Sequence, residues 1–162
     1  MGIKSLTQAL GNLDISLEKA NVFGYLTAEA ATTTTLADTY YTIQGTFSNP
    51  ILELFTADAT GITYIGEDTK TFKVIISSSV ASDTSTTNVY TGIALNGTVG
   101  SGCESNRLLK LTSDIGSWVT QCELTLETGD LVTLKVKSDK VGAELSFIQL
   151  QANIFPTTHL KE

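Results

Sequence analysis

The chain has 162 residues, of which 41% are hydrophobic and only 17% charged, a balance that fills one ordinary core and leaves a weakly charged surface. Its net charge of -7 argues against nucleic acid as a partner, because phosphate backbones require clustered Lys and Arg. No run approaches the roughly 18 apolar residues of a membrane span, and the opening residues lack an apolar signal core, so we expect a soluble chain that is not exported by the usual route.

Residues 3–20 form the first predicted element, an amphipathic segment. Gly11, Asn12 and Asp14 disfavour a helix interior, and fewer than three heptads are marginal for an isolated helix. The alternatives are a short trimeric helical bundle, an arm that packs on a partner in another conformation, and a disordered segment. The apolar residues recur in the steps of three and four that define a heptad: Ile3, Leu6, Leu10, Leu13, Leu17 and Ala20.

Residues 28–37 are a low-complexity stretch that contains four consecutive threonines. Such a stretch disfavours a helix and offers little to bury, so it is predicted to be a linker. From Asp38 onward the apolar period changes to two. We therefore divide the chain into an attachment arm and linker at 1–37, a β domain at 38–156 and a C-terminal tail at 157–162.

Beyond Asp38, apolar and polar residues alternate, and turn signals separate the runs at the spacing of a β-sandwich. Asn96-Gly97 is the strongest of these signals, because both residues tolerate positive φ in a two-residue hairpin. Thr128-Gly129-Asp130 marks another turn, and Pro156 closes the fold. The pattern predicts an all-β fold of two packed antiparallel sheets, with strands near residues 41–47, 51–55, 62–65, 71–77, 89–95, 108–112, 118–126, 132–136 and 145–155.

Two of these strands place a set of residues together on one face in the predicted register. The members of the two faces are Trp118, Cys122, Leu124 and Leu126, and Ile148, Leu150, Ala152 and Ile154.

The two cysteines of the chain are Cys103 and Cys122. They lack the CxxC spacing of a zinc site, and two cysteines do not indicate a disulfide framework. Because Cys122 falls in phase with apolar neighbours, two buried free thiols are favoured over a disulfide between them.

The sequence offers little for catalysis or metal binding. His159, the only histidine, lies in the polar tail, so any hydrolase triad would need it as its base. Asp58, Glu67 and Asp68 are the best candidate calcium ligands, but they lack the alternating pattern of a dedicated loop, and solvated loop carboxylates are favoured. We expect no catalytic residue, no metal and no cofactor.

Two ligand-related alternatives are less favoured. Tyr40, Tyr41 and Tyr90 could form an aromatic sugar-binding surface, although packing on a sheet is the preferred interpretation. A glycan hydrolase would require two carboxylates that face each other about 5–10 Å apart in a cleft.

Several motifs between Phe72 and Phe155 follow one another in a recognisable order. They are a strand at 71–74, an "x-NG-T-x" hairpin at 93–99, an "L-x-x-GD-x-V-x-L-x-V" run at 126–136 and a closing strand at 146–155. This stretch resembles the C1q/TNF-like domains that recur in tailed-phage structural proteins, including head fibres, capsid decoration proteins and tail spikes. The resemblance implies a jelly roll that assembles as a tight homotrimer with its final strands near the three-fold axis.

An outward apolar surface suits such a trimer. Leu131 beside Val132, and Phe147 beside Ile148, are expected to leave apolar groups that face away from the core. The predicted trimer contacts are Leu131, Phe147, Ile148 and Leu150.

Together these observations predict a non-enzymatic viral structural protein that is assembled in the host cytoplasm and located on the virion surface. In the favoured hypothesis it is a capsid decoration protein, of head fibre or cement type, whose arm binds the major capsid protein through Ile3, Leu6, Leu10, Leu13 and Leu17. The alternative is a tail fibre or spike tip that binds the host cell surface, with a glycan as candidate ligand, through the loop residues Asp83, Thr84, Ser85 and Thr86.

Overall fold

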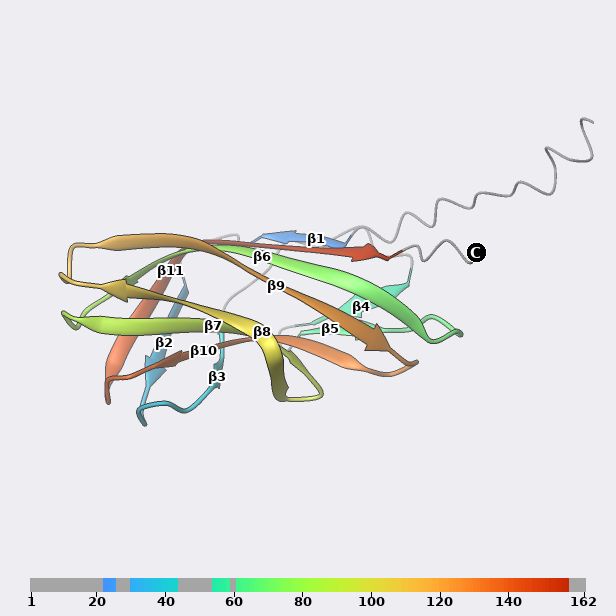
Figure 1. The fold of residues 1–162 in the computed structure, drawn as a ribbon, viewed down its shortest axis with the longest axis horizontal. Coiled ribbons are helices and arrows are strands. Elements are labelled where there is room, and N and C mark those ends of the chain that lie inside the picture. The colour runs from blue at the N-terminus through green and yellow to red at the C-terminus, as the bar shows by residue number, and fades with distance from the viewer. Residues whose placement is uncertain (1–21, 26–29, 44–53, 59–60, 158–162) are drawn as a thin grey trace, which may run out of the picture.

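The computed structural model describes residues 22–25, 30–43, 54–58 and 61–157. Every regular element within these ranges is a strand, and the strands form two antiparallel sheets packed face to face (Figure 1). The prediction of an all-β sandwich is therefore confirmed. The strands are β1 Val22–Tyr25, β2 Ala30–Thr34, β3 Tyr41–Thr42, β4 Phe55–Ala57, β5 Ile62–Tyr64, β6 Lys70–Ser82, β7 Thr87–Leu95, β8 Thr98–Leu109, β9 Ile115–Leu126, β10 Leu131–Ser138 and β11 Ala143–Pro156.

The two sheets are named here after their long C-terminal strands. The β11 sheet has the order β1-β11-β6-β9, and β2 pairs with the same β11. The β10 sheet has the order β4-β5-β10-β7-β8, with β3 also on β10. β9 and β8 are thus edge strands, one in each sheet.

Strict alternation in β6 shows why these residues form a sandwich. The side chains that point between the sheets are buried, whereas their neighbours point to the outer face, as the period of two requires. Equivalent positions on the other long strands complete one continuous core. The β6 contribution to that core is Phe72, Val74, Ile76, Ser78 and Val80.

An aromatic cluster of Phe55, Tyr64 and Phe72 fills one region of this core. The ring centroids lie 5.1–5.3 Å apart in tilted or edge-on pairs, the arrangement that aromatic quadrupoles favour. Tyr64 also donates its hydroxyl to the carbonyl of Asp68 at 2.7 Å, so its polar end is satisfied. The cluster holds the short strands β4 and β5 against β6.

The predicted Asn96-Gly97 hairpin turn is present. Both residues adopt positive φ, 50° and 86°, as a two-residue turn between β7 and β8 requires. Asn96 Nδ2 donates to Asp130 at 2.7 Å, and Asn96 Oδ1 accepts from the Leu131 N–H at 3.0 Å. The other carboxylate oxygen of Asp130 accepts from the Glu127 N–H at 2.8 Å, so this turn and the β9–β10 turn brace each other.

The prediction of a linker at 28–37 is wrong for residues 30–34, which form β2 and pair with β11. Alternate threonines point inward, and the buried Thr34 hydroxyl donates to the Ala143 carbonyl at 3.0 Å. Threonine is β-branched and suits a strand, and its hydroxyl finds a backbone partner when it is buried. Since β1 also pairs with β11, the body of the fold begins before residue 38.

The strand expected at 108–112 is found earlier in the chain, as β8. This strand begins at Thr98, directly after the hairpin turn, and ends at Leu109. Gly100 and Gly102 lie inside this strand. Most β8 side chains are exposed because the strand is at an edge, so its apolar period is too weak to mark it in the sequence.

A β-bulge changes the phase of β11. The register between β11 and β6 shifts between Phe147 and Gln149. As a result Phe147 and Leu150 are both buried, at 0% and 2% exposure, whereas Ile148 is 38% exposed on the outer face. The prediction that Ile148 and Leu150 share one face is therefore wrong, since an extra residue reverses a period-two pattern.

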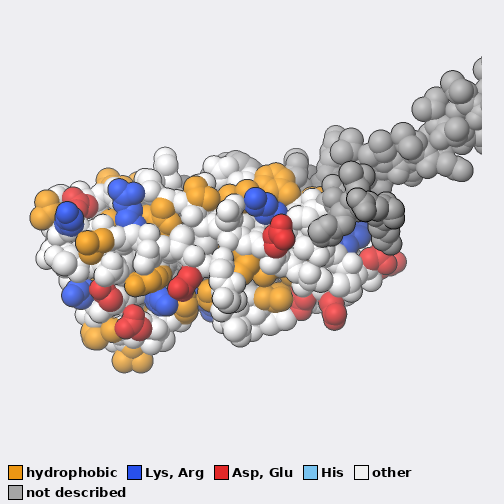
Figure 2. Space-filling model, in the orientation of Figure 1, with side chains coloured by type: hydrophobic (Ala, Val, Ile, Leu, Met, Phe, Trp, Pro, Cys, Tyr) orange, Lys and Arg blue, Asp and Glu red, His pale blue; other side chains and the backbone are white. Residues whose placement is uncertain are grey.

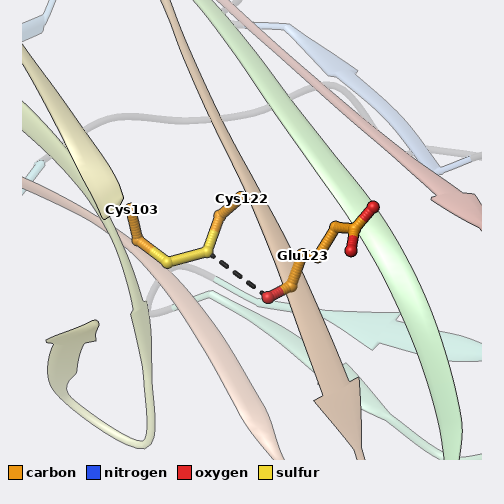
Figure 3. Close-up of a disulfide and its surroundings, with 3 residues drawn as sticks. All are labelled: Cys103, Cys122 and Glu123. Atoms are coloured by element: carbon orange, nitrogen blue, oxygen red, sulfur yellow. Dashed lines mark hydrogen bonds between the residues drawn. A yellow bond between two sulfur atoms is a disulfide. The ribbon is translucent and has the colours of Figure 1, made fainter. Parts of the chain in front are cut away.

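The expectation of free thiols is also wrong. Cys103 on β8 and Cys122 on β9 form a disulfide (Figure 3). Cys122 does point inward with its apolar neighbours, as predicted, but β8 runs across from it and brings the second sulfur within reach.

Candidate interaction surfaces

The outer face of the β11 sheet carries exposed apolar side chains. Four of the exposed large hydrophobic residues in the described part of the chain lie on it, in the outward phase of β9 and β11. An exposed apolar group on a sheet whose other face already covers the core indicates a surface for protein contact. These residues are Ile115, Val119, Ile148 and Phe155.

A shallow groove of about 520 Å³ lies in the middle of this face. Small serines line it over β6 and β9, and the Ser79 and Ser117 hydroxyls share a hydrogen bond of 2.8 Å. Ile148, Val119 and Gln149 form other parts of its wall. The small serine side chains leave open space in this part of the face, which a complementary partner surface can fill.

Only Ile148 of the four predicted trimer residues lies on this face. Phe147 and Leu150 point into the core, so their side chains cannot contact another subunit. Leu131 is half-buried in the β10 sheet, where it pairs with Thr63 of β5. Sequence reasoning missed Ile115 and Val119, although both occupy the phase of β9 opposite to the predicted core face, which was the available signal.

The candidate loop 83–86 belongs to a loop end, defined as residues 35–39, 83–86, 110–114 and 139–142. Backbone hydrogen bonds join these loops: Thr86 N–H donates to Lys110 at 3.1 Å, Asp83 N–H to Glu144 at 3.1 Å and Gly142 N–H to Thr34 at 2.7 Å. The loop end is therefore internally braced.

Side chains add to this bracing. Asp83 Oδ1 accepts from the Glu144 N–H at 2.9 Å, and Asp114 accepts from the Lys110 and Leu111 N–H groups at 2.9 and 3.0 Å. The loop end also exposes Leu36, Leu111 and Val141. At this end of the molecule, on the left of Figure 2, hydrophobic side chains are interspersed with charged ones.

A charged aromatic cluster lies on the outer face of the β10 sheet. The Lys137 ammonium lies 4.6 Å from the ring centroids of both Tyr40 and Tyr90, and 3.3 Å from the Glu104 carboxylate. Tyr40 donates its hydroxyl to Glu104. This hydrogen bond, with the nearby Lys137, holds the pKa of Glu104 below its usual value, whereas burial and the Glu104 charge raise the pKa of Tyr40.

These contacts favour packing over sugar binding for the tyrosines, because Lys137 occupies a ring face of Tyr40 and of Tyr90. Tyr41 is engaged as well: its hydroxyl accepts from the Leu36 N–H at 2.9 Å and shares a 2.7 Å hydrogen bond with Thr35.

Metal and catalytic candidates do not come together in the described residues. Within these residues, no three His, Cys, Asp or Glu side chains lie close enough together to bind a metal ion. The candidates Asp58, Glu67 and Asp68 therefore do not form such a group. Asp58 accepts the Gly61 N–H at 3.1 Å, a local loop contact. His159 and the arm residues Ile3, Leu6, Leu10, Leu13 and Leu17 lie outside the described residues. No helix long and apolar enough to cross a membrane occurs in the described ranges.

No protein-family model matches the chain, and no curated protein matches it in sequence. Solved structures do match. Vertex protein P5 of PRD1 aligns with a TM-score of 0.55 at 10% identity, covering 84% of this chain and 97% of that one. Murine APRIL aligns with a TM-score of 0.57 at 13% identity, covering 83% and 98%. The fold is a C1q/TNF-like jelly roll.

The jelly roll therefore confirms the fold that the motifs between Phe72 and Phe155 implied. At these identities the likeness establishes architecture alone, so the function has to be argued from the surfaces described above.

Proposed function

We propose that the chain is a non-enzymatic structural protein of a virus particle, which forms a homotrimer and decorates the capsid surface. The observation that carries the proposal is the outer face of the β11 sheet, where the exposed Val119 and Ile148 line a groove on a sheet already packed on its other side. The similarity of the jelly roll to a vertex protein supports a place on the virion.

Self-association explains why this face is apolar. Burial of Ile115, Val119 and Ile148 against a sister subunit removes their surface from water, which is the main driving force for association. A groove that receives a different, convex part of the next subunit makes a heterologous contact, and such a contact closes into a ring when the rotation permits. Three subunits are the state that the C1q/TNF-like resemblance implies.

Attachment is proposed to occur at the end opposite the loop end. Val22 pairs with Ile154, near the end of β11, whereas Thr34 pairs with Ala143 at its start, beside the loops. At roughly 3.3 Å per strand residue, β11 separates these two ends by about 35 Å. Residues 1–21 therefore join the body far from the loop end, and their apolar residues are proposed to bind the major capsid protein.

Three arms on one trimer reinforce one another. Once one arm is bound, the others are held at a high effective concentration near equivalent sites on neighbouring capsid subunits. The protein is proposed to assemble in the host cytoplasm and to remain on the virion surface with its loop end outward.

Sedimentation of purified protein tests the trimer. We expect a mass of three times the 17.2 kDa chain, and dissociation when Val119→Asp and Ile148→Asp are combined. Val141→Asp is the matched control, because Val141 is exposed to a similar or greater extent but lies at the loop end. A wild-type protein that remains monomeric at high concentration would contradict the proposal.

Particle binding tests the arm. Deletion of residues 1–21 leaves β1 in place, so the trimer should persist while co-sedimentation with particles lacking this protein is lost. Retained binding by the deletion variant would show that the body, not the arm, makes the attachment.

A second candidate, a tail fibre or spike tip that binds the host surface, is favoured by one observation. The loop end is braced by its own hydrogen bonds and exposes Leu36, Leu111 and Val141, so it is preorganised for a partner such as a glycan-bearing receptor. Substitution of Asp83, Thr84, Ser85 and Thr86 by alanine should abolish cell binding under this candidate, and should leave particle binding intact under the first.

A further inference from the structure

The disulfide joins the two edge strands of the sandwich. β8 is the outer strand of the β10 sheet and β9 is the outer strand of the β11 sheet, so the bond spans the open side between the sheets (Figure 3). The two Cα atoms lie 4.8 Å apart, and only 5% of Cys103 and 8% of Cys122 are exposed. The sulfurs therefore belong to the interior of this side.

The neighbouring inward positions are polar. We define the β8–β9 seam as Cys103 and Ser105 of β8 with Trp118, Thr120 and Cys122 of β9. The Ser105 and Thr120 hydroxyls are hydrogen-bonded to each other, and Thr120 in turn lies 2.5 Å from the Thr91 hydroxyl. Trp118 Nε1 donates to the same Thr91 hydroxyl at 2.8 Å. Hydroxyls and sulfur thus take the place of large aliphatic side chains along the seam.

The other contacts in the middle of β8 are polar or backbone contacts: Glu104 binds Tyr40 and Lys137, Ser105 binds Thr120, and the backbone pairs with β7. Within its sheet, β8 is paired with β7 only, because it is the edge strand. The register between β7 and β8 shifts between Gly92 and Ala94. The large buried residue of β8 is Leu109, at its far end. Arg107 adds a 3.2 Å hydrogen bond to the Ser117 carbonyl near that end. Between the hairpin turn and Leu109, the disulfide is the covalent link between β8 and the opposite sheet.

We infer that Cys103 and Cys122 form a redox-operated latch that fixes β8 after the chain has folded. In the dithiol state the jelly roll is folded but β8 opens locally; in the disulfide state it is locked to β9. The inference rests on the proposed function for one point only, that the chain is made in a reducing cytoplasm and later meets oxidising surroundings on the particle.

The chemistry needs an oxidant, which is a low-molecular-weight disulfide such as oxidised glutathione. The thiolate of one cysteine attacks a sulfur of that disulfide and releases one small thiol. The second cysteine, as its thiolate, then attacks the mixed disulfide, forms the Cys103–Cys122 bond and releases the second small thiol. Two protein thiols are oxidised, one external disulfide is reduced to two thiols, and protons are conserved. Because both sulfurs are shielded, exchange proceeds through the open form of β8.

Hydrogen–deuterium exchange on the full-length protein tests the latch. The native protein is equilibrated with reduced or with oxidised glutathione, and thiol alkylation counts the free cysteines in each sample. We expect two alkylated cysteines in the first sample and none in the second, with exchange in β8 faster by about tenfold or more in the reduced sample. Exchange in β6 and β11 should be unchanged.

The double variant Cys103→Ser with Cys122→Ser is the matched control. It should show fast β8 exchange in both glutathione samples, and Glu123→Ala, a change at an exposed position on the outer face of β9 outside the groove, should behave like the wild type. The latch is overturned if the thiols remain free in oxidised glutathione, if β8 exchange is the same in both states, or if reduction exposes β6 and β11 as well. Sedimentation of the same samples reports the trimer separately, so a monomer would contradict the proposed function and leave the latch result standing.

Discussion

The aromatic cluster and the β8–β9 seam stabilise the same sandwich by different chemistry. Phe55, Tyr64 and Phe72 are held by burial and ring contacts, which solution redox conditions do not alter. The seam depends on hydroxyl hydrogen bonds and a disulfide, which are individually weaker or chemically reversible. The comparison teaches that one domain can contain a permanently closed region and a conditionally closed one.

Phe72→Ala is the change with the largest expected effect. Phe72 is fully buried and contacts both other rings, so its truncation removes apolar contacts and leaves a cavity. We expect a loss of about 3–5 kcal/mol in the free energy of unfolding, measured by urea titration. Lys73→Ala, on the outer face of the same strand, is the control. A loss no larger than that of the control would break the distinction between the two regions.

Removal of the disulfide should have the next largest effect. The bond closes a loop with a sequence separation of 19, and its loss increases the entropy of the unfolded chain. We expect about 3 kcal/mol less stability for the Cys103→Ser, Cys122→Ser variant than for the oxidised wild type. Reductant should lower the urea midpoint of the wild type. It should lower the midpoint of Phe72→Ala by the same amount. A reductant effect confined to one of these two proteins would show that the regions are coupled.

Thr91→Val tests the hydroxyl part of the seam. The change keeps the shape of the side chain but leaves the Trp118 N–H without its acceptor. We expect a loss of about 1–2 kcal/mol in the free energy of unfolding, with a change in Trp fluorescence that reports the altered surroundings of the indole. Thr71→Val, at an exposed threonine pair on the outer face, should change stability much less.

The smallest effect is expected at the braced turns. Hydrogen bonds from the Glu127 N–H and from Asn96 hold the pKa of Asp130 below its ordinary value of 3.8. A carboxyl group with a lowered folded-state pKa contributes stability that is present above pH 3.8 and is lost as the pH falls through the folded value. Asp130→Asn should therefore show a slightly lower urea midpoint at pH 7 and a shallower decline below pH 4. An unchanged acid profile would show that the exposed turn contributes nothing measurable.

The parts of the fold that the sequence predicted are those where local chemistry and period agree. Asn96-Gly97 specifies its own turn because both residues tolerate positive φ, and the long strands alternate cleanly. β2 was missed because a run of threonines carries no apolar period, even though β-branched residues suit a strand. The arm could not be compared, since residues 1–21 lie outside the described structure.

The interaction surfaces were harder to predict than the fold. Ile148 was placed on one face with Leu150, and Phe147 and Leu150 were expected at the trimer contact, because nothing in the local sequence marks the bulge that reverses the phase of β11. The disulfide was not expected either, since the partner of Cys122 is set by the path of β8, an exposed edge strand without a readable period. Both errors arise where tertiary pairing decides the outcome, and not local propensity.

β1 and β2 pair with opposite ends of β11, at 151–154 and 143–147. This arrangement has a practical consequence for the use of the protein to display foreign peptides. Foreign peptides inserted between Thr84 and Ser85, or at Val141, would be carried about 35 Å from the point where residue 22 joins the body. Cargo fused ahead of residue 22 would instead face whatever the protein is anchored to. The same scaffold thus offers two addressable poles for presenting antigens or enzymes.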